Sequence, residues 1–116
     1  MRLQIAAFVA GAALACVIAP SVAQIRVVPV TIDNFVFEPA RLVVKAGTTV
    51  TWTNRDDIPH TVAATDRLFK SKAMDTDESY SFTFSTPGEY SYFCSLHPHM
   101  TGTIVVEGTT GSSASQ

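Results

Sequence analysis

Cys94, His97 and Met100 place three metal-binding side chains within seven residues, in a C-x₂-H-x₂-M pattern. Soft sulfur ligands beside an imidazole suit copper. A trigonal site of one Cys and two His, with a long axial Met, is typical of copper sites that transfer electrons. The cluster lacks one His, and His60 is the candidate that supplies it. The alternative interpretation is structural: a buried Cys, surface histidines and a Met that fills a gap in the core.

The N-terminal residues have the three parts of a secretory signal peptide. Arg2 provides a positive charge, an apolar run follows, and Ser21-Val22-Ala23 fits a cleavage site. We therefore expect residues 1–23 to be removed and the mature chain to begin at Gln24, in the periplasm. A retained anchor is one alternative, although the apolar run is shorter than the roughly 20 residues that span a bilayer. Lipidation at Cys16 is another.

Cleavage would leave Cys94 as the only cysteine of the mature chain. Exported proteins usually use cysteines in pairs, as disulfides. A lone thiol in an oxidising compartment is therefore best explained as a metal ligand. A nucleophilic cysteine is the rival hypothesis, but it would need a His base and an orienting Asn or Asp, and no motif in the sequence supports it.

The overall charge argues against some classes of partner. The chain has eight Lys and Arg against ten Asp and Glu, a formal net charge of −2 at pH 7. Such mild acidity does not favour binding to nucleic acid or to an anionic membrane. The sequence also contains no glycine-rich loop of the kind that binds phosphate.

From residue 24 onward the chain is expected to form short strands separated by turns. We count seven or eight strands and find no convincing amphipathic helix, which predicts an all-β fold, an antiparallel Greek-key β-sandwich of one domain over residues 24–107. Residues 65–79 are the least regular and carry a charge run that we interpret as a solvated face. Residues 108–116 are predicted to be a flexible tail. The strands are expected at 25–32, 35–37, 41–45, 49–54, 80–84, 90–94 and 103–107.

Alternation of side chains is clearest in residues 49–54. Val50, Trp52 and Asn54 fall on one face, and three threonines fall on the other. This period of two is typical of a half-buried strand. We expect Trp52 to lie in the core, where a large aromatic ring buries much apolar surface.

The same pattern predicts the direction of other side chains. Phe35 and Phe37 are expected to share one face of their strand. In residues 90–94 the inner face ends at Cys94, so the thiol should point into the sandwich at the end of a strand.

The ordered set of these residues resembles the cupredoxins, and within them the small amicyanin-like and pseudoazurin-like blue copper proteins. The resemblance covers nearly the whole mature chain. It implies one type 1 copper ion that alternates between Cu(I) and Cu(II). The matching residues are Phe37-Glu38-Pro39, Gly47, Val50-Thr51-Trp52-Thr53-Asn54, Pro59-His60, Phe82-Thr83-Phe84, Gly88-Glu89-Tyr90, Cys94-Ser95-Leu96-His97-Pro98-His99-Met100, Gly102 and Val105-Val106.

The resemblance also implies roles for individual residues. The equatorial ligands would be His60, Cys94 and His97, with Met100 axial. The residues around them would be Asn54, Thr61 and Pro98, and the contacts with a partner would come from Pro59 and His99.

Two positions depart from the family pattern. Many relatives have Asn where this chain has Thr61, so we expect changed hydrogen bonding around the ligands rather than a lost site. An aromatic residue often occupies the position of His99, which changes the apolar patch used for docking.

The resemblance implies a monomeric electron carrier that meets redox proteins transiently and catalyses no reaction of its own. The main alternative is a copper-binding protein for delivery or storage. A sandwich that is metal-free or holds zinc is a third hypothesis, although zinc favours Cys, His and carboxylate and has no use for Met100. A fragment of a multicopper oxidase is a fourth, but the chain lacks the extra histidines such enzymes need.

Overall fold

The computed structural model describes residue 4, residues 11–15 and residues 25–109. The predicted cleavage site, Cys16 and residues 110–116 lie outside the described residues. The signal peptide, the domain bounds and the tail therefore stay predictions. Among the described residues, no helix is both long enough and apolar enough to cross a membrane.

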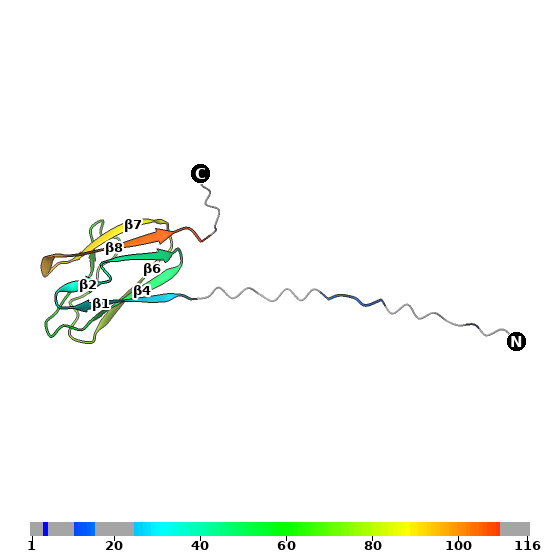
Figure 1. The fold of residues 1–116 in the computed structure, drawn as a ribbon, viewed down its shortest axis with the longest axis horizontal. Coiled ribbons are helices and arrows are strands. Elements are labelled where there is room, and N and C mark those ends of the chain that lie inside the picture. Colours follow the sequence, from blue (N-terminus) through cyan, green and yellow to red (C-terminus); the bar gives the residue numbers. More distant parts are fainter. Residues whose placement is uncertain (1–3, 5–10, 16–24, 110–116) are drawn as a thin grey trace.

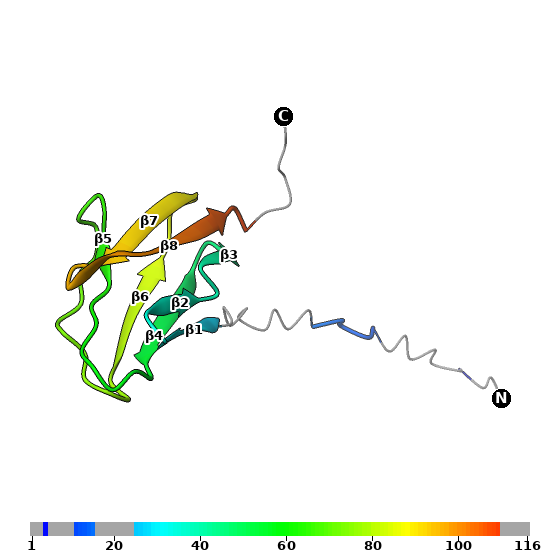
Figure 2. The ribbon, with the colours of Figure 1, turned by 60° about the vertical axis from the view of Figure 1, so that its left-hand side comes forward.

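In residues 25–109 eight strands form two four-stranded sheets, which share one core between them (Figures 1 and 2). One sheet has the strand order β2-β1-β4-β6 and the other has the order β3-β8-β7-β5. The predicted all-β sandwich is thus confirmed. The strands are β1 (Val27–Asp33), β2 (Val36–Glu38), β3 (Arg41–Lys45), β4 (Thr48–Asn54), β5 (Ala63–Ala64), β6 (Ser79–Phe84), β7 (Gly88–Cys94) and β8 (His97–Glu107).

Two strand pairs run parallel, which corrects the prediction of a purely antiparallel sandwich. β1 pairs in parallel with β4, and β3 pairs in parallel with β8, whereas the other pairs are antiparallel. Parallel neighbours need a long crossover connection, and β2 and β3 provide it between β1 and β4. Side-chain alternation indicates which face of a strand is buried but not the direction of its neighbour, so the sequence pattern is the same for either pairing.

The core is built around Trp52 of β4, as expected. Val50, Trp52 and Asn54 are fully buried, and the ring of Trp52 lies 5.4 Å from that of Tyr92 and 5.8 Å from that of Phe69. Burial of each such apolar side chain stabilises the fold by about 1.5–3 kcal/mol. On the other face of β4, Thr49, Thr51 and Thr53 pair with hydroxyls of β6 at 2.7 to 2.8 Å.

Phe35 does not lie on the same face as Phe37, which corrects a second expectation. Phe37 is buried in the core, whereas Phe35 is 42% exposed. Asn34 and Phe35 form the two-residue turn between β1 and β2, with φ angles of 52° and 62°. Positive φ at both positions is typical of a type I′ hairpin turn, and a non-glycine residue in this region costs about 1–3 kcal/mol. The turn interrupts the strand that was expected at 35–37. The alternation of side chains that would place Phe35 and Phe37 on one face therefore does not extend to Phe35.

Residues 65–79 pack more closely against the sandwich than their composition suggests. The charged residues of the run, Lys70 to Glu78, are exposed as predicted, but Phe69 and Met74 are buried. The backbone of Met74 pairs with that of His60 through two hydrogen bonds, of 2.8 and 3.2 Å. This segment therefore supports the part of the chain that carries His60.

The last strand is longer than predicted and begins at His97 rather than at residue 103. Its first residues pair with the end of β7, where Cys94 faces His97 and the register shifts between Phe93 and Cys94. The pairing of β7 with β8 therefore fixes the segment that carries the C-x₂-H-x₂-M pattern on both sides.

Candidate metal centre

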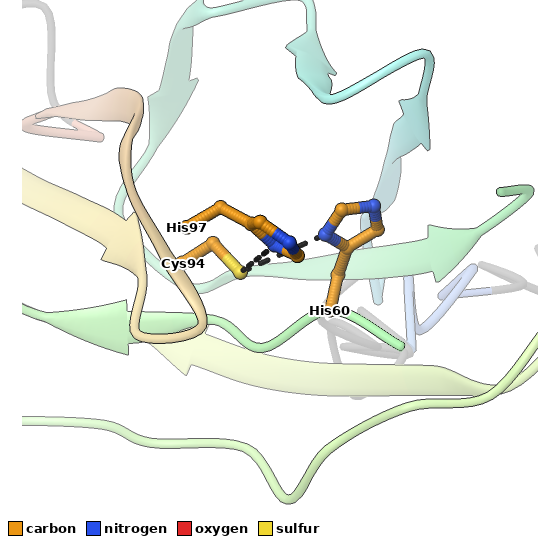
Figure 3. Close-up of side chains that lie close together, drawn as sticks. All are labelled: His60, Cys94 and His97. Atoms are coloured by element: carbon orange, nitrogen blue, oxygen red, sulfur yellow. Dashed lines mark hydrogen bonds between the residues drawn. The ribbon is translucent and has the colours of Figure 1, made fainter. Parts of the chain in front are cut away.

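The structure brings His60, Cys94 and His97 together at one end of the sandwich (Figure 3). Their donor atoms all lie within 4.8 Å of one another. Cys94 Sγ is 3.7 Å from the Nδ1 atom of His60 and also 3.7 Å from the Nδ1 atom of His97. Cys94 ends β7, His97 begins β8, and His60 precedes β5 by three residues.

These separations fit a metal ion. Two ligands bound at about 2.0 and 2.3 Å to a single ion, the usual lengths for imidazole nitrogen and thiolate sulfur on zinc, are about 3.7 Å apart when the angle between them is near 120°. Each of the two nitrogens is thus spaced from the sulfur as in a trigonal site. Two imidazoles and a thiolate, with a thioether nearby in the sequence, form a donor set that fits copper.

The three donors differ in their exposure to solvent. His60 and Cys94 are 0% exposed, whereas His97 is half-buried. Met100 is 2% exposed and lies in β8, three residues after His97. The structure therefore buries three of the four expected ligands and leaves one imidazole near the surface.

The surroundings of Cys94 favour the thiolate, which is the form that binds metal. Burial by itself raises the pKa of the thiol, but the Thr61 N–H, the contacts with the His60 and His97 rings and the backbone of Leu96 outweigh it and lower the pKa from 9.0 to about 6. The Thr61 N–H lies 3.4 Å from the sulfur.

Thr61 connects the His60 segment to the Cys94 segment. Its Oγ1 accepts a hydrogen bond from Ser95 N–H at 2.7 Å, pairs with the Ser95 hydroxyl at 2.7 Å, and lies 3.8 Å from Cys94 Sγ. The expectation that these hydrogen bonds differ from those of the family stays a prediction. Ser95 was not singled out from the sequence, although its position next to Cys94 was a usable signal.

Asp56 contacts the His60 ring, although the sequence did not predict this contact. The sequence places it in a polar turn, where a carboxylate is usually solvated, yet Asp56 is 9% exposed and its Oδ2 lies 2.7 Å from His60 Nε2. Burial tends to raise the pKa of Asp56, but hydrogen bonds from the Phe35 and Asn34 N–H groups and from His60 lower it below 3.8. The only signal in the sequence was the spacing of four residues before His60.

Asn54 braces the same turn from inside the sandwich. Its Oδ1 accepts the Asp56 N–H at 2.9 Å, and its Nδ2 donates to the carbonyl oxygens of Ile58 and Met74, both at 2.9 Å. The assignment of Asn54 to the surroundings of the ligands stays a prediction.

The remaining expected residues lie at the surface. Pro59, Pro98 and His99 are exposed. Pro59 precedes His60 directly, Pro98 follows His97 directly, and His99 is two positions after His97. Leu96 is 51% exposed. Phe35, which was expected to share one face with Phe37, instead lies nearly perpendicular to both imidazoles, with ring centroids 5.4 Å from His60 and 5.1 Å from His97.

The sequence model of the cupredoxin-like domain matches residues 5–106 of this chain. The chain belongs to the cupredoxin-like family. This cupredoxin is 36% identical to amicyanin from Paracoccus versutus over 85 residues, which are 69% of the chain and 64% of that relative. It is 34% identical to amicyanin-alpha from Methylorubrum extorquens over 113 residues, 89% of the chain and 92% of the relative. The chain thus spans slightly less than two thirds of the Paracoccus protein.

Solved structures give the same family. A purple cupredoxin from Nitrosopumilus maritimus is 32% identical, with a TM-score of 0.67, over 69% of this cupredoxin and 99% of that chain. The Cu(I) form of an amicyanin variant is 38% identical, also with a TM-score of 0.67, over 75% of this cupredoxin and 87% of that chain. Together with the spacing of the donors, these likenesses identify the centre of this cupredoxin as a type 1 copper site.

Proposed function

We propose that this cupredoxin carries single electrons between redox proteins that it meets transiently. The observation that carries the proposal is a buried sulfur, Cys94 Sγ, with an imidazole nitrogen on either side at 3.7 Å. His60, Cys94 and His97 would hold the copper equatorially, and Met100 would be the axial ligand. Bound copper supplies a centre that gains or loses one electron as it alternates between Cu(I) and Cu(II).

The protein contributes a site that excludes water and changes little in shape. Cys94 and His60 are fully buried, and their backbones are held by β7, β8 and the segment paired with Met74. Donors fixed by a packed frame need little rearrangement when the charge of the site changes, which lowers the barrier to electron transfer.

His97 is proposed as the point where the electron enters or leaves. Its ring is half-buried, while exposed Leu96, Pro98, His99 and Phe35 surround it in sequence or in space. Redox encounters usually bury small areas, and a mostly uncharged rim of this kind suits a short-lived contact.

The burial of the thiol favours a carrier over a protein that delivers or stores copper. A delivery site must pass its metal to another protein, which requires ligands that the acceptor can reach. The full burial of Cys94 and His60 works against such an exchange. We further propose that the mature protein is a monomer in the periplasm and is not an enzyme, with the periplasmic location resting on the predicted signal peptide.

Addition of Cu(II) to the purified metal-free protein tests this proposal. We expect one copper per chain and an intense visible absorption band from the copper–thiolate bond. Reduction by ascorbate should remove the band, and oxidation by hexacyanoferrate(III) should restore it. A protein that binds Cu(II) without an intense band, or that cannot be cycled between the two states, would contradict the electron-carrier function.

A further inference from the structure

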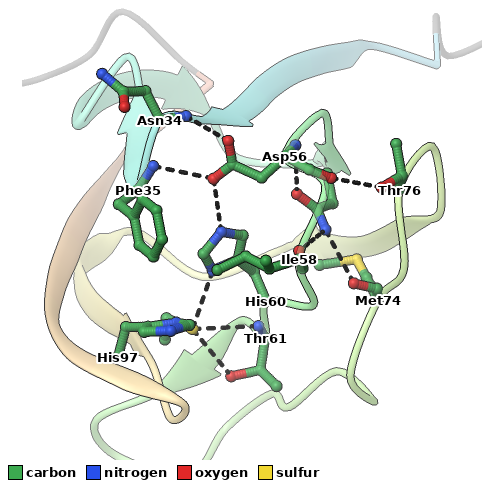
Figure 4. A network of polar contacts seen from close by, with 11 residues as sticks. Asn34, Phe35, Asp56, Ile58, His60, Thr61, Met74, Thr76 and His97 are labelled. Carbon is green, nitrogen blue, oxygen red and sulfur yellow. Dashed lines mark hydrogen bonds and ion pairs between the residues drawn. The ribbon is translucent and has the colours of Figure 1, made fainter.

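One carboxylate, that of Asp56, contacts both the His60 ring and the turn between β1 and β2 (Figure 4). Oδ1 accepts the Asn34 N–H at 2.6 Å. Oδ2 accepts the Phe35 N–H at 3.0 Å and lies 2.7 Å from His60 Nε2. Three groups from two separate segments therefore converge on a side chain that is only 10% exposed.

These contacts determine which nitrogen of His60 carries the hydrogen. A backbone N–H can only donate, and an ionised carboxylate can only accept. His60 Nε2 must therefore donate to Oδ2. In a neutral imidazole the other nitrogen then has a free lone pair, and this nitrogen, Nδ1, is the one that lies 3.7 Å from Cys94 Sγ.

The same carboxylate holds Phe35 in place. The turn requires positive φ at both Asn34 and Phe35, and its two N–H groups are the ones that Asp56 accepts. In this conformation the Phe35 ring meets the His60 ring at 86° and the His97 ring at 88°. The two imidazoles also contact each other, with centroids 5.0 Å apart.

We propose that Asp56 is a positioning residue for both histidines: it orients His60 directly and restrains His97 through the ring of Phe35. The inference rests on the copper site of the proposed function, and the contacts that carry it lie between groups of the protein itself. A purely structural role, in which Asp56 only closes the turn, predicts no effect on the His60 tautomer and none on the spectrum of the copper site.

The first test uses the wild-type protein and needs no copper. Nitrogen-15 NMR of the metal-free, isotope-labelled chain distinguishes the two neutral tautomers of each histidine. We expect the His60 ring to carry its hydrogen on Nε2. A hydrogen on Nδ1 of His60 would overturn the proposal.

The second test replaces Asp56→Asn and uses Asp57→Asn as the matched control. Asn replaces one carboxylate oxygen, a hydrogen-bond acceptor, with an amide NH₂ group, which can only donate. The NH₂ group would then face another donor, either an N–H of the turn or the Nε2–H of His60. We expect the Nδ1–H tautomer of His60 to gain population, the His97 ring signals to shift, and the reduction potential of the copper form to rise because a negative charge is lost. Asp57 is exposed, so Asp57→Asn should leave the tautomer and the His97 signals as in the wild type. An unchanged His60 tautomer in Asp56→Asn would refute the direct role.

The third test, Phe35→Gly, separates the direct effect of Asp56 on His60 from its effect on His97 through the Phe35 ring. Glycine adopts positive φ without strain, so the turn and its bonds to Asp56 should persist while the ring is lost. We expect an unchanged His60 tautomer, shifted His97 ring signals and an altered Cu(II) electron paramagnetic resonance spectrum. His97 signals and a Cu(II) spectrum identical to the wild type would refute the role of Phe35.

The tests also separate this inference from the proposed function. If Asp56→Asn does not fold, the wild-type tautomer and the Phe35→Gly variant still decide the inference. A wild-type protein that gives no intense visible band with Cu(II) would refute the proposed function, whereas the NMR results in the metal-free protein would still test how Asp56 positions the histidines.

Discussion

Cys94 illustrates how single residues control the site. Its side chain is fully buried, which by itself disfavours a charged thiolate, yet the donors around it lower its pKa to about 6. Two of the groups that contact it, Thr61 and His60, are 33 and 34 positions away in the sequence. The chemistry of the thiol thus depends on a contact between two separate loops.

Replacement of the thiol tests its role as a ligand. We expect Cys94→Ser to abolish the intense visible band with Cu(II), because serine cannot provide thiolate-to-copper charge transfer, while far-ultraviolet circular dichroism retains the β spectrum of the wild type. A Cys94→Ser protein that remains intensely coloured would show that Cys94 does not bind copper.

The axial position is tested by Met100→Gln. Copper should stay bound through the other three ligands, but the reduction potential measured by voltammetry should fall, because an oxygen donor favours Cu(II) over Cu(I) more than a soft thioether does. An unchanged or higher potential would mean that Met100 is not the axial ligand.

The hydroxyl of Thr61 is tested by Thr61→Val, which conserves shape. Loss of the acceptor for Ser95 N–H should lower the free energy of unfolding by about 1–2 kcal/mol and shift the visible band, since a hydroxyl near the sulfur is removed. The control Thr51→Val removes a hydroxyl that pairs with Ser81 on the outer face of β4 and should change stability by no more than about 0.5 kcal/mol. Denaturant unfolding and the Cu(II) spectrum measure both effects, and equal losses in the two variants would contradict a special role for Thr61.

At the scale of elements, the pairing of β7 with β8 positions both Cys94 and His97. The pairing is close at Gly102, which lies opposite Tyr92. A Cβ at Gly102 would overlap the ring of Tyr92, with Cε1 only 2.8 Å away. Tyr92 in turn contacts Phe37 and Trp52, so the ring has little room to move.

We therefore expect Gly102→Ala to destabilise the protein by about 1–3 kcal/mol, the usual cost of overpacking a core. Gly108→Ala is the matched control, because a Cβ there meets nothing within 4 Å, and it should leave the thermal midpoint nearly unchanged. Similar midpoints for the two variants would show that β8 can shift away from Tyr92 without cost.

At the scale of the whole molecule, the charge of Cys94 links folding to pH. The pKa is about 6 in the folded protein and 9.0 without the surrounding donors. The unfolded chain therefore binds more protons between these values, and stability rises with pH across that range. The contribution is fully present above pH 9 and is lost as the pH falls to about 6.

This dependence predicts a difference between two metal-free proteins. Relative to Cys94→Ser, the wild type should gain free energy of unfolding as the pH rises from about 6 to 9, and the difference should be constant below that range. Urea unfolding at a series of pH values measures it. A difference that does not vary with pH would mean that the buried thiol is not ionised in this range.

Much of the site could be predicted from the sequence because it depends on local order. The C-x₂-H-x₂-M spacing holds whatever the fold, and the alternation around Trp52 and before Cys94 indicates which side chains face inward. These patterns correctly predicted a β-sandwich with Cys94 buried at a strand end. His60 followed from the need for a second imidazole among three histidines.

Only the tertiary structure decided the contacts that make these ligands functional. Asp56 reads as a solvated turn residue until the β1–β2 turn, 21 and 22 residues away in the sequence, brings two N–H groups to its carboxylate. The sequence pattern predicts Phe35 on the same face as Phe37, whereas positive φ in the turn places its ring against His60 and His97. The parallel pairing of β1 with β4 could not be predicted from the sequence either. In each case the deciding quantity is a backbone angle or a pairing between distant segments, and residue order alone specifies neither, because both arise only when the whole core packs at once.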